Sequence, residues 1–121
     1  GGIVVGYEIG RQLDIETIFA ERVKGDLVLR RGFEIQKNSN VLIVEDVITT
    51  GKSALECLSI IKKYNSNLLG FACIIDRSDK NLLIKDKIVS QIKFKFETYN
   101  NDKLPEELKN LKPVKPGSRN I

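Results

Sequence analysis

The residues of this chain best suited to chemistry are two adjacent carboxylates followed by a loop rich in threonine and glycine. Glu45 and Asp46 follow an apolar run, and a helical pattern begins a few residues later. The loop residues are Val47, Ile48, Thr49, Thr50, Gly51, Lys52 and Ser53. Unpaired N–H groups at a helix start hold a phosphate well, and a glycine lets the backbone wrap around it. The carboxylates would then accept hydrogen bonds from the hydroxyls of a sugar attached to that phosphate.

Two other interpretations of this stretch are weaker. Its end, Gly51-Lys52-Ser53, is similar to the P-loop of nucleoside triphosphatases. That motif requires a glycine five residues before its second glycine, and this chain has Asp46 there. The other interpretation is an acidic strand end before a capped helix, with no ligand. Two unpartnered charges at a buried strand end would cost desolvation energy, so a binding site is favoured.

The elements that position this motif follow from the periodicity of apolar residues. Residues 41–44 form a continuous apolar run, typical of a buried parallel strand that ends at Glu45-Asp46. After the loop of residues 47–53, a helix is predicted to about residue 64. Residues 68–75 are predicted to form a second buried strand that ends in Asp76-Arg77. The fold class is therefore α/β, with a mostly parallel sheet flanked by helices. Both acidic strand ends lie at the edge where such sheets bind ligands.

The flanking segments give weaker signals. Residues 2–10 carry glycines four apart, which suits a helix packed closely on a sheet, whereas their β-branched residues favour a strand. The pattern alone leaves both open. Residues 17–21 are predicted to be a short strand, and residues 22–32 a basic loop or hairpin, with pairing resuming near residues 33–35. The alternating residues 92–96 are predicted to be a half-exposed strand.

Composition narrows the class of protein. The 121 residues suit one domain, with 41% hydrophobic and 30% charged residues, and residues 112–121 are predicted to be an irregular tail. The net charge of +4 suits an enzyme for polyanionic small molecules or a nucleic-acid binder. With no histidine and no C-x-x-C pair, Cys57 and Cys73 are expected to be buried thiols rather than zinc ligands. No apolar run reaches the ~20 residues of a membrane helix, so a cytoplasmic protein without a membrane partner is expected.

Residues 41–53 resemble the phosphoribosyl-pyrophosphate (PRPP) signature of type I phosphoribosyltransferases at every position. That signature is a hydrophobic strand, an acidic pair and a Thr- and Gly-rich phosphate loop. The resemblance implies a Rossmann-like core in which residues 45–53 bind PRPP. Glu45 and Asp46 would bind the ribose 2′- and 3′-hydroxyls, and residues 49–53 would hold the 5′-phosphate. It also implies Mg²⁺, bound mainly through PRPP and pyrophosphate and not by a dedicated set of protein ligands.

Further segments are similar to the orotate phosphoribosyltransferases within that family. They are Gly1-Gly2, Ala20–Arg22 with Leu29–Phe33, Ile75–Ser78 and Lys115–Arg119. The resemblance implies a helix over residues 3–12 and a mobile catalytic loop over residues 22–32. Arg22 and Lys24 are the candidates in that loop for stabilising the leaving pyrophosphate. Arg77 would pair with the orotate carboxylate, assisted by Thr49. The N-terminal part of the family domain is expected to be missing.

This resemblance implies that orotate and PRPP form orotidine 5′-monophosphate and pyrophosphate, in pyrimidine biosynthesis, with no nucleic-acid partner. A homodimer is expected, with the loop shared across the interface. The alternatives are transfer to another nucleobase, a regulator that binds nucleotides and RNA on the same fold, and a catalytically inactive subunit. Arg77 could instead form a surface ion pair with Asp76 or Asp79, and Arg22 and Lys24 could belong to a solvated charged loop.

Overall fold

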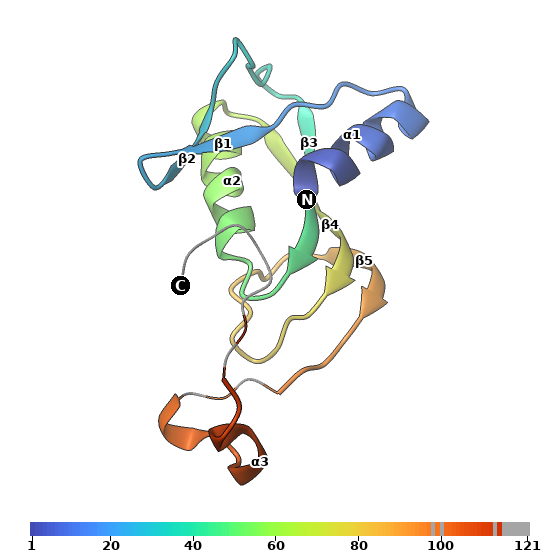
Figure 1. Cartoon of the computed structure of the whole chain (residues 1–121). Coiled ribbons are helices and arrows are strands. Elements are labelled where there is room, and N and C mark those ends of the chain that lie inside the picture. Colours follow the sequence, from blue (N-terminus) through green and yellow to red (C-terminus); the bar gives the residue numbers. More distant parts are fainter. Residues whose placement is uncertain (98, 100, 113, 115–121) are drawn as a thin grey trace.

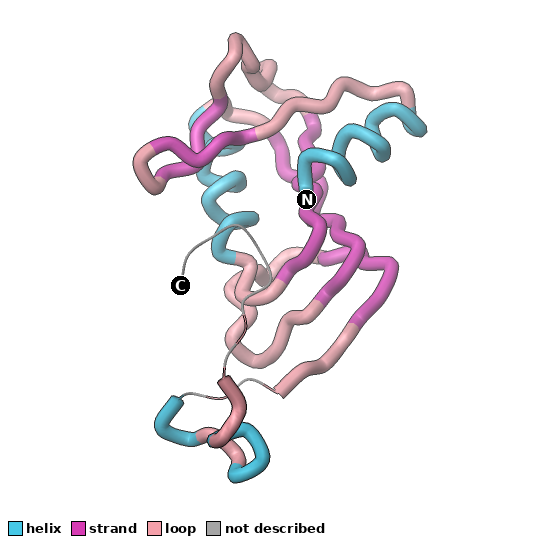
Figure 2. The backbone as a smooth tube through the Cα atoms, viewed as in Figure 1, coloured by secondary structure: helices cyan, strands magenta, loops and turns pink. Residues whose placement is uncertain are grey.

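The computed structural model describes residues 1–97, 99, 101–112 and 114. Its helices and strands, in chain order, are α1 (Gly2–Leu13), β1 (Ala20–Val23), β2 (Asp26–Leu29), β3 (Asn40–Ile48), α2 (Lys52–Lys63), β4 (Asn67–Asp76), β5 (Ile88–Lys93), η1 (Asn101–Lys103) and α3 (Glu106–Lys109). Figure 1 shows a small sheet with a helix on each side. Figure 2 shows that the connection between β4 and β5 is a loop without a helix. Within the described part of the chain, no helix is both long and apolar enough to cross a bilayer.

The central sheet has three parallel strands in the order β3-β4-β5. This confirms the predicted α/β class with a parallel sheet flanked by helices. One prediction about β3 is wrong: the strand does not end at Glu45-Asp46 but continues to Ile48, pairing Val47 with Ile75. Val47 and Ile48 are β-branched and pair well on a sheet, so extended structure persists through the acidic pair. The two carboxylates therefore lie within the strand, and their side chains point to opposite faces.

The hydrophobic core fills the face of the sheet that α2 covers. Its buried members are Ile43, Ile48, Ala54, Ile61, Phe71, Cys73 and Ile84. The apolar positions of α2 recur at helical spacing, which lets one side of the helix pack against β3 and β4. This packing fixes the start of α2 beyond the carboxyl end of β3. Both cysteines have free thiols. Cys73 is buried, as predicted, whereas Cys57 is only partly buried.

The first helix covers the other face of β3. The structure resolves the ambiguity over residues 2–10 in favour of α1, because small residues let the helix approach the strand closely. A methyl group added to Gly6 would touch Val44, and one added to Gly10 would collide with the Thr17 hydroxyl. Tertiary packing thus outweighs the strand propensity of the β-branched residues. The carboxyl end of β3 lies beside the start of α1 (Figure 1).

The hairpin β1–β2 corrects two predictions. The first strand begins at Ala20 rather than at Thr17, and its partner is Asp26–Leu29 rather than residues 33–35. The reason is the two-residue turn Lys24-Gly25, in which both residues have positive φ, at 50° and 101°. Such a turn matches the twist of paired strands and closes the hairpin at once. Residues 22–32 are therefore largely a hairpin, and their mobility remains a prediction.

The last strand is also displaced from its predicted position. β5 spans Ile88–Lys93 and not residues 92–96, because the pairing with β4 starts opposite Phe71. Residues 94–96 continue beyond the sheet edge, where their alternation exposes two phenylalanines. Of the predicted irregular tail, only Lys112 and Val114 are described, so the similarity over residues 115–119 lies outside the described residues.

Candidate functional site

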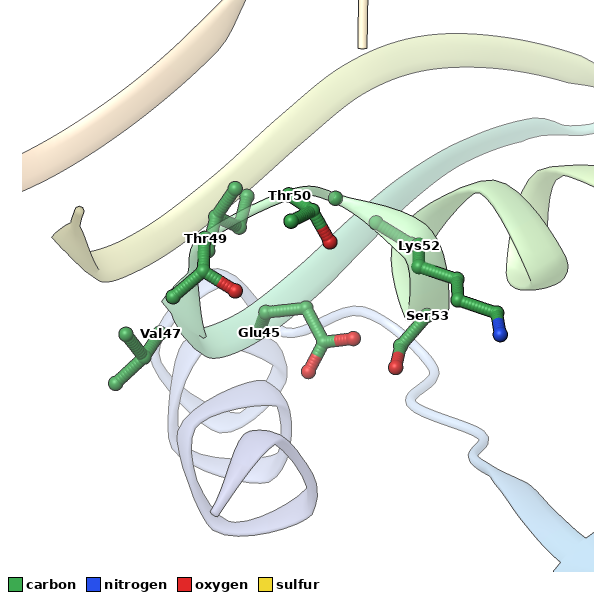
Figure 3. A pocket seen from close by; sticks show the side chains of 9 residues that line it. Glu45, Val47, Thr49, Thr50, Lys52 and Ser53 are labelled. Atoms are coloured by element: carbon green, nitrogen blue, oxygen red, sulfur yellow. The ribbon is translucent and has the colours of Figure 1, made fainter. Parts of the chain in front are cut away.

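An open hollow of about 300 Å³ lies where β3 passes into α2. Its lining includes Glu45 and then runs without a break through the loop to the first turn of α2: Val47, Ile48, Thr49, Thr50, Gly51, Lys52, Ser53 and Ala54. The structure thus brings together every sequence-predicted PRPP-binding residue except Asp46. In Figure 3 the hydroxyl groups of Thr49, Thr50 and Ser53 and the Glu45 carboxylate surround the same space, while Lys52 extends outward.

Asp46 lies on the other face of β3, toward the start of α1. Its Oδ1 accepts a hydrogen bond of 2.9 Å from the Val47 N–H, and its Oδ2 lies 3.7 Å from the Gly1 nitrogen. Gly2 approaches the neighbouring Glu45 so closely that a methyl group on it would come within 3.0 Å of Oε2. The two glycines therefore lie against the acidic pair, one beside each carboxylate.

The Glu45 carboxyl group is electrostatically unusual. Burial raises its pKa above the ordinary value, and the negative charge of Asp46 raises it further. Both effects disfavour the ionised form, which would be stabilised by a hydrogen-bond donor or a positive charge close to the carboxylate. Its ionised form is therefore ready to accept hydrogen bonds from sugar hydroxyls, or to lie beside a cation.

Gly51 fixes the shape of the loop. It precedes the first turn of α2 with φ 78°, in the left-handed region that favours glycine. A methyl group here would come within 2.6 Å of Ile84, which is buried beneath the loop. The loop is also held from below, because the Leu83 N–H donates to the Thr50 carbonyl at 2.9 Å and the Arg77 N–H donates to the Ile48 carbonyl at 2.8 Å.

Gly51→Ala is therefore expected to destabilise the protein by about 1–3 kcal/mol, because it adds backbone strain to a collision with Ile84. The same change is expected to weaken binding of any phosphate held by the loop. Urea unfolding and PRPP titration would measure the two effects. Gly25→Ala is the matched control, since that glycine also has positive φ but has open space around it. Equal effects of the two substitutions would show that crowding at Gly51 is unimportant.

A second open hollow, of about 410 Å³, adjoins the first and shares two residues with it. It is lined by Thr49, Thr50, Arg77, Asp79, Asn81 and Phe96. Arg77 and Thr49, which sequence reasoning grouped as a base site, are thus brought together. Sequence reasoning missed Asp79, Asn81 and Phe96. The first two could have been suspected because they directly follow a strand end at the ligand-binding edge.

Asp76 anchors the segment that carries Arg77. It is 3% exposed, accepts a 2.8 Å hydrogen bond from the Ser78 N–H and forms an ion pair of 3.1 Å with Lys93. Burial opposes its ionisation more than any other single effect, but the donors of Ser78 and Lys93 together outweigh it and lower its pKa. Asp79 is bonded to Asn81, through the backbone N–H at 2.8 Å and the side-chain amide at 3.1 Å. Among the described residues, neither aspartate pairs with Arg77.

Asp76→Asn is expected to lower the free energy of unfolding by about 1–3 kcal/mol at neutral pH, because it removes a buried charge that has two donors. Since the folded-state pKa of Asp76 is lowered from 3.8, its contribution is present above that value and is lost as the pH falls through the folded pKa. Urea unfolding from pH 7 to pH 3 would measure this, with exposed Asp86→Asn as the control. A deficit that stays constant down to pH 3 would contradict the ionic contribution.

The two loop candidates lie on the hairpin, outside the linings of both hollows. Arg22 forms an ion pair of 2.7 Å with Glu56 of α2 and also donates to the Gly25 carbonyl. Lys24 is exposed at the tip of the hairpin turn. The structure therefore does not bring these two residues together with Glu45 and the loop.

A parallel strand that leads through a Thr- and Gly-containing loop into a helix start, with a carboxylate facing the loop, is an arrangement in which α/β proteins hold phosphorylated ligands. The phosphoribosyl transferase domain matches residues 1–103, and the chain belongs to this family. The fold is also similar to that of adenine phosphoribosyltransferase from Leishmania donovani, with a TM-score of 0.55 over 88% of this chain and 55% of that one, at 21% sequence identity.

Three proteins with sequences similar to this chain are orotate phosphoribosyltransferases. That of Methylorubrum populi is 47% identical over 98% of this chain and 61% of its own length. That of Chlorobium phaeobacteroides is 44% identical over 100% of this chain and 63% of its own length. That of Maricaulis maris is 40% identical over 100% of this chain and 62% of its own length. The chain thus spans about three fifths of the length of these relatives.

Proposed function

We propose that the protein transfers the phosphoribosyl group of PRPP to orotate, forming orotidine 5′-monophosphate and pyrophosphate for pyrimidine biosynthesis. The observation that carries this proposal is the pair of adjoining hollows that share Thr49 and Thr50. One is lined by a phosphate-binding type of loop and a carboxylate, and the other by an arginine. The similarity to named orotate phosphoribosyltransferases along the whole chain supports orotate as the acceptor.

PRPP would occupy the first hollow. The N–H groups at the start of α2 and the hydroxyls of Thr50 and Ser53 would bind its 5′-phosphate. Glu45 would accept hydrogen bonds from the ribose hydroxyls. Asp46 lies outside this hollow, on the other face of β3, so its contact with the same sugar would require its side chain to turn toward the hollow. As pyrophosphate leaves the anomeric carbon, positive charge develops on the ribose ring, and the two carboxylates would stabilise it.

The residues present fit a magnesium ion that is delivered with PRPP. Mg²⁺ in phosphate-handling sites is usually held by one or two carboxylates together with substrate oxygens. Glu45 offers such a carboxylate in the hollow. Its pKa is raised, so a nearby cation would favour its ionised form. When bound, the ion would neutralise charge on the departing pyrophosphate. It would be held mainly through PRPP and pyrophosphate.

Orotate would occupy the second hollow. The planar guanidinium of Arg77 matches a carboxylate through two parallel hydrogen bonds, and the Thr49 hydroxyl would donate to the same group. Because Thr49 borders both hollows, a base held there would lie next to the anomeric carbon of PRPP. A neutral purine has no carboxylate for the arginine, which favours orotate over other nucleobases.

The hairpin would act on the leaving group. Arg22 and Lys24 carry positive charge on residues 22–32, and closure of that segment would bring them to pyrophosphate and exclude water from the activated sugar. Both residues lie outside the hollows of their own chain, so we propose that they serve the site of a second copy in a homodimer. Closure would require the Arg22–Glu56 ion pair to open, at a cost of about 1 kcal/mol or less because both groups are partly exposed.

The test is orotate consumption by the complete gene product, followed by ultraviolet absorbance with PRPP and Mg²⁺. Loss of orotate only when PRPP is present would establish the reaction. Adenine, guanine, hypoxanthine and uracil are assayed in parallel, and turnover of one of these instead would assign another base. PRPP binding without turnover of any base, together with salt-dependent RNA binding, would favour a regulator on the same fold.

A further inference from the structure

Phe96 is an exposed aromatic residue at the base end of the site. Its side chain is 52% exposed, yet it lines the second hollow together with Arg77. The Arg77 guanidinium carbon lies over the ring, 5.1 Å from its centroid, which is within the range of a cation–π interaction. The arginine expected to recognise the substrate thus lies against an aromatic face and in no ion pair with another described residue.

The position of Phe96 is built into the sheet. Lys93 ends β5 and forms the ion pair with buried Asp76, the residue directly before Arg77. One residue further on, the Phe94 N–H donates to the Asp76 carbonyl at 2.9 Å, and the Phe94 and Phe96 rings pack with centroids 5.6 Å apart. The two segments that carry Arg77 and Phe96 are therefore joined at Asp76, which brings the two residues within reach of each other.

We propose that Phe96 determines specificity at the base site. Its ring holds the Arg77 guanidinium in the orientation needed for a two-point contact with a carboxylate. It also gives the hollow an apolar wall against which a flat, anionic heterocycle can pack. This inference rests on the proposed function, because it concerns the same base site.

The chemistry of the hollow supports this role. A free arginine side chain loses rotamer entropy when it binds a carboxylate, and stacking on an aromatic ring reduces that loss because the guanidinium is already ordered. Asp79, the carboxylate that also lines the hollow, is bonded to Asn81 rather than to Arg77. Among the described residues the guanidinium therefore has no carboxylate partner and is available to a ligand. The neighbouring aromatic ring favours a planar ligand.

The test compares Phe96→Leu with Phe96→Tyr in the complete gene product. Phe96→Leu is expected to raise KM for orotate about three- to tenfold, with kcat and KM for PRPP within twofold of the wild type. Phe96→Tyr keeps the aromatic face and is expected to restore KM. Phe19→Leu is the matched control, because Phe19 makes the other arginine–phenylalanine contact of the described residues, with Arg31 at 6.0 Å, and lines neither hollow.

A double variant separates this role from a merely structural one. If Phe96 acts through Arg77, adding Phe96→Leu to Arg77→Ala raises KM for orotate by less than it does in the wild type. An unchanged KM in Phe96→Leu, fully additive effects, or an equal rise in KM for PRPP would each overturn the inference. Calorimetric titration with orotate and orotidine 5′-monophosphate keeps the proposed function separate. Absence of turnover in the wild type would refute only the proposed phosphoribosyl transfer. Orotate binding that is unaffected by Phe96→Leu would refute the proposed role of Phe96.

Discussion

Glu45→Gln is expected to lower kcat/KM for PRPP by about a hundredfold to a thousandfold. Glutamine keeps the size of the side chain but removes the negative charge that would stabilise the developing positive charge on the ribose ring, a loss typical of preorganised electrostatic groups. Glu45 is the carboxylate that faces the loop, so its effect should be larger than that of any other single charge in the hollow. Steady-state kinetics with varied PRPP at saturating orotate would measure the change.

Two companion variants sharpen this prediction. Glu34→Gln makes the same chemical change at an exposed position outside both hollows, and it is expected to keep wild-type kinetics. Asp46→Asn is expected to lower turnover as well, because the proposed ribose site uses both carboxylates. If Asp46→Asn leaves turnover unchanged, the acidic pair does not act as a unit, and Glu45 alone serves the sugar. Normal kinetics in Glu45→Gln would contradict the ribose-binding role altogether.

The pH dependence offers a further check on Glu45. Burial and the Asp46 charge raise its pKa, so protonation begins at a higher pH than for an ordinary glutamate. Activity that requires the ionised form is then lost as the pH falls through that raised value, and the acid limb of kcat/KM should lie above pH 4.5. The limb should be absent from the residual activity of Glu45→Gln. A limb that is unchanged in this variant would assign the titration to another group.

The elements around the site were predictable where local pattern and tertiary packing agree. The buried strands β3 and β4 and the helix between them are marked by apolar runs and by helical spacing, and sheets of this kind bind ligands at one edge. The ends of elements were less predictable. Pairing with β4 draws β3 through two carboxylates to Ile48, and the Lys24-Gly25 turn closes the hairpin early. Both outcomes depend on partners and backbone angles that a linear pattern does not specify.

The residues of the candidate site also divide into those that the sequence predicted and those that it did not. The loop from Thr49 to Ser53 is contiguous in the chain, so its residues could be grouped from sequence and they do line one hollow. Phe96 reaches the base end from 19 residues beyond Arg77, through the register of β5 against β4. Its period-two pattern predicted a half-exposed strand and gave no sign of a contact with an arginine. Long-range register, rather than residue type, decides such neighbours.

Arg77→Ala is expected to raise KM for orotate about tenfold to a hundredfold, with KM for PRPP unchanged. A charge-assisted pair between a guanidinium and a carboxylate contributes about 1.5–3 kcal/mol, and alanine removes all of it. Arg77→Lys should recover part of the loss, because lysine restores the charge but has neither the fork nor the guanidinium that lies over the Phe96 ring. Kinetics with each substrate varied in turn would measure the split between the two KM values.

The control for this prediction is Arg11→Ala, which removes an exposed arginine that pairs with Glu8 on α1. It should leave both KM values at wild-type level. A rise in KM for PRPP but not for orotate in Arg77→Ala would place the guanidinium at the ribose-phosphate end and refute the base-site assignment. The two hollows meet at Thr49 and Thr50, so only this split between substrates can decide which of them the arginine serves.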